Sequence, residues 1–189
     1  MRRGIAVLTT LLALLLLAGC GKEEAQTQQA IDFRTELLSA GGCAFDADVR
    51  VDYGQTIAEF SMHCAASTAD GVDMTVTAPE TLAGIGAHVD GSGAKIVYDG
   101  AEIGFSATAG GKLAPMALPW LLTDCWSEGY IAYSGMEDGA LRVTYLHGYG
   151  AQELQADVWF TDGTPVRAEI CCDGQRVVTA ELSNFTFEA

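Results

Sequence analysis

Few residues of this chain have the types and spacing that acid–base, nucleophilic or metal chemistry requires. The three histidines, His63, His88 and His147, are scattered, and no Cys-x-x-Cys or His-x-x-x-His pair supplies zinc-ligand spacing. No Gly-x-Ser-x-Gly motif marks a nucleophile. Carboxylates are plentiful, but they fall on the polar side of alternating segments, as a solvated surface does. We therefore expect a protein without a metal, a cofactor or catalytic activity. The alternative is that it is an envelope hydrolase.

Cys20 is the residue with the most informative surroundings. Arg2 and Arg3 precede an apolar run over Ile5–Ala18, and the run ends in the letters LAGC. The run is shorter than the roughly 20 residues that span a bilayer, but its length and basic tip are typical of a secretory signal. Its ending resembles the lipobox of bacterial lipoproteins, which implies cleavage before Cys20, a diacylglyceryl thioether on its sulfur and often a further acyl group such as palmitate. The alternative is a plain signal peptide with a chance cysteine.

Charge and length limit what the secreted part can be. Without residues 1–19 the chain loses Arg2 and Arg3 and keeps 8 basic and 25 acidic residues, a formal charge of −17. A chain this acidic is not expected to bind nucleic acid, and it is not expected to contact anionic lipid through a basic patch. We expect a signal peptide over 1–19, the lipidated cysteine and a polar tether over 20–29, and one monomeric domain over 30–189. It would be anchored on the extracytoplasmic face of the cell membrane.

The domain reads as mainly β with two helices. Ala30, Phe33, Leu37 and Ala40 recur at helical spacing, which predicts a helix over 29–40. From Cys43 onward apolar and polar residues alternate, and frequent Asp-Gly pairs indicate about ten short strands. A second helix is expected over 119–126, because Pro119 suits a helix start. One long antiparallel sheet must be covered or curl. We therefore predict an α+β fold in which both helices lie in the concavity of a strongly curved sheet.

The first hairpin also bears on the thiols. Pairing Val49 with Ala58 makes the apolar faces of the two strands agree, and it places Cys43 directly opposite Cys64. Export permits oxidation, so this register predicts a Cys43–Cys64 disulfide. The alternative is that both are small core residues.

Three segments resemble the LolA-like lipoprotein-carrier superfamily: "PETLAGI", "KIVYDGAEIGF" and "DGTPVRAEICCDGQRVVTAELSNFTFEA". They look most similar to lipid-anchored members in Firmicutes, including spore-germination lipoproteins. The resemblance implies an incomplete antiparallel barrel with helices in a hydrophobic cavity, and no catalysis. It implies binding of lipoproteins, lipids or envelope partner proteins. This chain departs from the soluble carriers in carrying an anchor, and no ligand-binding residue transfers.

A set of apolar side chains from distant strands shares, by alternation, the face that a curled sheet turns inward. We expect this face to meet an acyl chain or an apolar segment of an envelope partner, unless the protein is structural and has no ligand. The central helix either fills this concavity as core or acts as a movable lid through Trp120, Leu121 and Trp126. The expected ligand-facing residues are Phe45, Phe60, Met62, Met74, Tyr145, Val158, Phe160 and Ile170.

Overall fold

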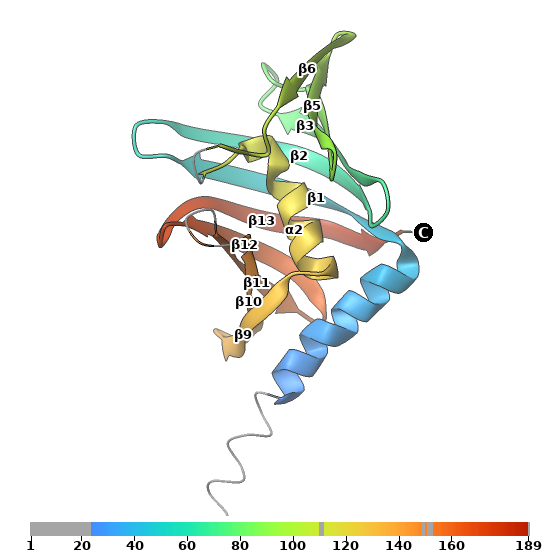
Figure 1. The fold of residues 1–189 in the computed structure, drawn as a ribbon, viewed down its shortest axis with the longest axis vertical. Helices are drawn as coiled ribbons and strands as arrows, with labels where there is room; N and C mark the ends of the chain where they lie inside the picture. Colours follow the sequence, from blue (N-terminus) through green and yellow to red (C-terminus); the bar gives the residue numbers. More distant parts are fainter. Residues whose placement is uncertain (1–23, 110–111, 149, 151–152, 189) are drawn as a thin grey trace, which may run out of the picture.

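A computed structural model of the chain describes residues 24–109, 112–148, 150 and 153–188. Its main element is an 11-stranded antiparallel sheet with the order β6-β5-β4-β3-β2-β1-β13-β12-β11-β10-β9. Two meanders therefore meet where β1 pairs with β13, and the sheet curves without closing (Figure 1). The strands are β1 (Gly42–Asp52), β2 (Ile57–Ser67), β3 (Gly71–Ala78), β4 (Gly86–Asp90), β5 (Gly93–Tyr98), β6 (Ala101–Phe105), β9 (Tyr130–Glu137), β10 (Ala140–His147), β11 (Leu154–Thr161), β12 (Thr164–Cys172) and β13 (Gln175–Phe187).

The connection between β6 and β9 carries the remaining elements. A two-stranded ribbon of β7 (Thr108–Ala109) and β8 (Lys112–Leu113) leads into a 3-10 turn, η1 (Pro115–Ala117), and then into α2 (Leu118–Ser127). Pro119 lies in the first turn of α2, as expected. The N-terminal helix covers residues 24–40, so it begins earlier than the predicted residue 29, and residues 24–29 of the predicted tether are helical. None of the helices in the described part of the chain is long and apolar enough to cross a membrane.

Four Asp-Gly pairs make the tight hairpins of the sheet. In each pair both residues have a positive φ, between 48° and 88°, as a two-residue hairpin turn of type I′ requires. Asparagine, aspartate and glycine tolerate this conformation better than other residues do. The pairs are Asp99-Gly100, Asp138-Gly139, Asp162-Gly163 and Asp173-Gly174.

Both helices cover the same face of the sheet (Figure 1). This face is lined by buried residues at alternate positions of the strands, such as Ala47, Val49 and Val51 of β1. Leu37 of the N-terminal helix and Leu121 and Trp126 of α2 are fully buried against it. The predicted fold class, a curved antiparallel sheet with two helices in its concavity, is confirmed.

The register of the first hairpin differs from the prediction. Val49 pairs with Phe60 rather than with Ala58, a shift of two residues. Cys43 consequently lies opposite Ala66, and Cys64 lies opposite Phe45. The two cysteines are diagonal neighbours, whose separation of about 7–8 Å is too long for a disulfide. The described cysteines are all free thiols, so the predicted Cys43–Cys64 bond is not formed.

Candidate functional site

The residues expected to face a ligand do lie on the concave face, but the two helices cover most of them. Phe45, Met62, Met74, Tyr145, Val158, Phe160 and Ile170 are buried, and Phe60 is half-buried. Trp126 of α2 supplies much of the cover, because its indole contacts Phe45 and Phe33 with ring centroids 5.5 and 5.7 Å apart. The concavity is therefore occupied by the protein's own aromatic side chains.

Of the three residues proposed for a lid, two are core residues in this structure. Leu121 and Trp126 are fully buried, whereas Trp120 is half-buried and packs edge-on against His147, with ring centroids 5.4 Å apart. The indole nitrogen of Trp126 is fully buried and lacks a hydrogen-bond partner among the described residues. A buried donor without a partner costs roughly 1–3 kcal/mol. The unpaired indole N–H of Trp126 therefore lowers the stability that α2 gains by packing on the sheet.

Arg34 joins the N-terminal helix to the end of α2. Its Nε donates to the carbonyl of Trp126 at 2.8 Å, and its Nη2 donates to the carbonyls of Cys125 at 3.2 Å and Gly129 at 2.6 Å. The last carbonyls of a helix have no partners within the helix and carry a partial negative charge. The half-buried guanidinium of Arg34 therefore caps α2 from another element. Sequence reasoning missed Arg34, since helix periodicity does not reveal what a polar residue meets.

Two further polar contacts hold the helices to the sheet. His147 of β10 bonds through Nδ1 to an Asp124 carboxylate oxygen of α2 at 2.8 Å. Thr27 of the N-terminal helix shares a 2.7 Å hydrogen bond with the Ser134 hydroxyl of β9. With Arg34, these contacts are few and directional, in contrast to the continuous apolar packing beneath them.

A cleft of about 480 Å³ opens between the N-terminal helix and the tips of two hairpins, β9–β10 and β11–β12. Phe33, Leu141, Phe160 and Met136 give it an apolar lining. Phe33 also connects it to the buried aromatic cluster, because its ring lies 5.0 Å from Phe160 and 5.7 Å from Trp126 between centroids. The acidic residues Asp32, Glu36 and Asp162 also line the cleft, and none of the described residues that line it is basic. Phe160 is the expected ligand-facing residue that the structure places in this cleft.

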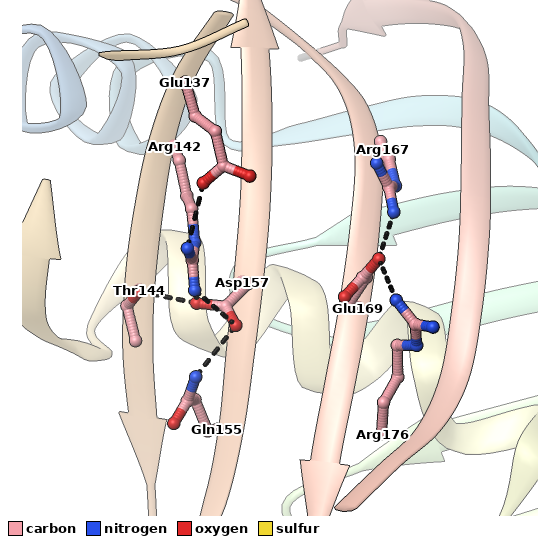
Figure 2. Close-up of polar contacts among 8 residues, drawn as sticks. All are labelled: Glu137, Arg142, Thr144, Gln155, Asp157, Arg167, Glu169 and Arg176. Atoms are coloured by element: carbon pink, nitrogen blue, oxygen red, sulfur yellow. Dashed lines mark hydrogen bonds and ion pairs between the residues drawn. The ribbon is translucent and has the colours of Figure 1, made fainter. Parts of the chain in front are cut away.

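The opposite face of the sheet carries charged residues that are more buried than the alternation suggested. Asp157 is only 3% exposed; it accepts hydrogen bonds from Thr144 at 2.5 Å and Gln155 at 2.8 Å, and its carboxylate lies 3.1 Å from the guanidinium of Arg142 (Figure 2). Glu169 on β12 is similarly bonded by two arginines. The expectation that these carboxylates are solvated was wrong here, because neighbouring strands place arginines against them.

The described thiols and histidines do not assemble a reactive centre. Burial raises the pKa of Cys43 to about 12 and raises those of Cys64 and Cys125 further, so these thiols stay protonated. Each histidine ring instead bonds an aspartate: His63 with Asp46, His88 with Asp73, and His147 with Asp124. Within the residues that the structure covers, no three His, Cys, Asp or Glu side chains converge on one point as metal ligands would.

The fold has distant likenesses among solved structures. No protein-family model matches the sequence, and no curated protein matches it. A LolA superfamily protein from Nitrosomonas europaea aligns over 86% of this chain and 93% of its own, with a TM-score of 0.46 and 9% identity. A domain named for outer membrane lipoprotein sorting, from Vibrio parahaemolyticus, aligns over 88% and 94%, with a TM-score of 0.49 and 10% identity. Lipoprotein LppX of Mycobacterium tuberculosis aligns over 87% and 95%, with a TM-score of 0.40 and 14% identity. These likenesses concern the course of the chain through the sheet and helices.

Proposed function

We propose that this chain is a non-enzymatic lipoprotein of the extracytoplasmic membrane face, anchored through Cys20, that binds an acyl chain at the cleft between its N-terminal helix and the sheet. The observation that carries the proposal is the cleft itself. Its volume lies in the range of about 300–1,000 Å³ that small-molecule sites occupy. The wall of the cleft at Phe33 is continuous with the aromatic cluster under α2. An acyl chain that enters the cleft therefore contacts apolar surface from the start.

The helices decide how tightly such a chain binds. The cleft alone offers limited apolar surface, and deeper entry requires α2 or the N-terminal helix to move away from the concave face. The free energy of that displacement opposes the favourable burial of the acyl chain, so only the surplus appears as affinity. The few polar contacts of Arg34, Asp124 and Thr27 set part of this cost. We therefore expect weak binding that strengthens with chain length.

The cleft's acidic residues predict which acyl compounds bind. Asp32, Glu36 and Asp162 are carboxylates beside a low-dielectric apolar surface, and a fatty acid would bring a fourth negative charge to them. A neutral acyl ester avoids this repulsion. Esters should therefore bind more tightly than the corresponding free fatty acids, and the difference should shrink as salt is added.

The test is a titration of residues 20–189 carrying Cys20→Ser with a fluorescent acyl ester. Met136→Glu adds a charge to the cleft at a side chain that is 55% exposed, so we expect the variant to fold. The matched control is Ile57→Glu, because Ile57 is 54% exposed and lies at the start of β2, outside the cleft. Met136→Glu should weaken binding about tenfold, which corresponds to about 1.4 kcal/mol, and the control should leave it unchanged. Absence of saturable binding, or equal effects of both substitutions, would reject an acyl site at this cleft.

A further inference from the structure

The β5–β6 hairpin projects from the end of the sheet farthest from β9 (Figure 1). β6 (Ala101–Phe105) is the last strand in the sheet order, and its outer edge has no strand partner in the part of the chain that the structure describes. Ile103 is 66% exposed and Tyr98 is 56% exposed. Edge strands of soluble proteins are commonly protected by charge, proline or cover. This one presents an exposed isoleucine at its centre.

The turn fixes which backbone groups of β6 face outward. Asp99-Gly100 is a two-residue turn, so Tyr98 and Ala101 form the hydrogen-bonded pair next to it. Antiparallel pairs alternate between hydrogen-bonded and non-hydrogen-bonded. Ile103 therefore bonds to β5, whereas the N–H and C=O groups of Glu102 and Gly104 point away from the sheet. These outward groups lie symmetrically on the two sides of Ile103.

This arrangement is complementary to itself, and we propose that two copies of the chain pair antiparallel through the outer edges of β6, with Ile103 on the two-fold axis. Glu102 of each copy then forms a hydrogen-bonded pair with Gly104 of the other, so every outward group of the strand is used. Ile103 faces Ile103 of the second copy in a non-hydrogen-bonded pair, where Cα atoms are about 4.5 Å apart. The two sheets become one continuous sheet.

The side chains agree with this register. Ile96 lies beside Ile103 on the same face, so four isoleucines line up across the junction. On that face Ala101 of one copy meets Phe105 of the other, a small residue against a large one. On the other face Glu102 meets Gly104, so the two glutamates do not oppose each other directly. Lys95, which pairs with Gly104 within its own chain, lies next in that row and supplies the opposite charge.

The alternative register that centres on Glu102 is disfavoured. It would place the two Glu102 carboxylates directly opposite each other, and like charges in that position destabilise a strand pair. A register centred on Gly104 would pair Glu102 with Ser106, which lies beyond the end of the strand. The proposed dimer does not depend on acyl binding, since the β5–β6 hairpin lies outside the cleft. The proposed dimer differs from the monomer expected from the sequence.

The experiment is cysteine cross-linking of the full chain in membranes of producing cells. Ile103→Cys should form a disulfide-linked dimer under mild oxidation, because the paired positions are close enough for a disulfide. Tyr98→Cys is the matched control: it is similarly exposed on the same hairpin, but it lies on β5, away from the axis. The unsubstituted chain controls for the other thiols. Dimer from Ile103→Cys alone supports the proposal, whereas no dimer, or equal dimer from both variants, overturns it.

A second variant tests the backbone contact. Gly104→Pro removes an outward N–H without removing a hydrogen bond to β5, and a Cβ added at Gly104 meets the carbonyl oxygen of Ala94 at 3.9 Å, an ordinary van der Waals contact. Added to Ile103→Cys, it should reduce the cross-linked fraction severalfold while circular dichroism stays unchanged. An undiminished cross-link in a folded double variant would show that side-chain collision, and not strand pairing, brings the copies together.

Discussion

Replacing Arg34 by methionine should loosen α2 without unfolding the sheet. Arg34 donates three hydrogen bonds to carbonyls around the end of α2. Hydrogen bonds from charged groups contribute roughly 1.5–3 kcal/mol each, but these carbonyls are only partly buried and accept water when the guanidinium leaves. The favourable interaction with the helix terminus contributes about 0.3–1 kcal/mol. We therefore expect the local free energy of opening α2 to fall by about 2–3 kcal/mol.

Hydrogen exchange measured by mass spectrometry reads this change directly. Peptides covering α2 should exchange roughly 30- to 150-fold faster in Arg34→Met, because each 1.4 kcal/mol is a factor of about ten. Peptides of β1 and β13 should be unchanged. If displacement of α2 opposes ligand entry, the same variant should also bind the acyl ester more tightly. The control is Arg50→Met, whose exposed ion pair with Glu59 contributes less than about 1 kcal/mol. Equal exchange of α2 in both variants would show that Arg34 does not hold the helix.

Three other results are expected. Cys20→Ser should leave the protein unprocessed or released from membranes after a high-salt wash, and undiminished retention would contradict lipid attachment. Asp157→Ala should cost about 3 kcal/mol in chemical denaturation, because it leaves Thr144 and Gln155 without their acceptor and leaves the partly buried guanidinium of Arg142 with Glu137 as its remaining partner; a loss under 1 kcal/mol would contradict this. A hydrogen bond to Asp73 raises the pKa of His88 above its usual 6.5, so the stabilisation is complete below pH 6.5 and disappears as the pH rises through the raised value. His88→Gln should therefore be less stable than the wild type in mild acid and equal at alkaline pH, and a pH-independent difference would refute the assignment.

The apolar face of the sheet could be predicted, whereas its registers could not. Side chains alternate with a period of two, so pairing Val49 with Ala58 or with Phe60 gives the same two faces. The turn decides between them. Tyr53 donates its N–H to the carbonyl of Thr56, and Asp52 accepts the N–H of Gly54, which makes a four-residue loop. The alternation alone does not encode that loop, and the disulfide prediction depended on it.

No regular alternation in the sequence marks β9, for a related reason. A bulge opposite Thr144 and Tyr145 shifts the phase of the strand, so Ile131 and Ser134 both turn toward the core. No single period describes such a segment. The candidate site was predicted in part: Phe160 was identified, but the cleft depends on where residues 24–40 cross the hairpin tips. That placement follows from tertiary packing, and neighbours such as Asp32 and Met136 carry no local signal of it.

The meeting of β1 with β13 has a consequence for the order of folding. The two meanders, residues 42–105 and 130–187, are built from contacts between neighbours in the chain, whereas this seam joins Cys43 to Phe187. Closing a loop of that length has a higher entropic cost than any hairpin in either half, and folding rates fall as such long-range contacts increase. The N-terminal meander can form before the rest of the chain is available. The edge of β1 and the apolar face of this meander then stay uncovered until β13 pairs with β1. Until that pairing occurs, the exposed edge and apolar surface can aggregate.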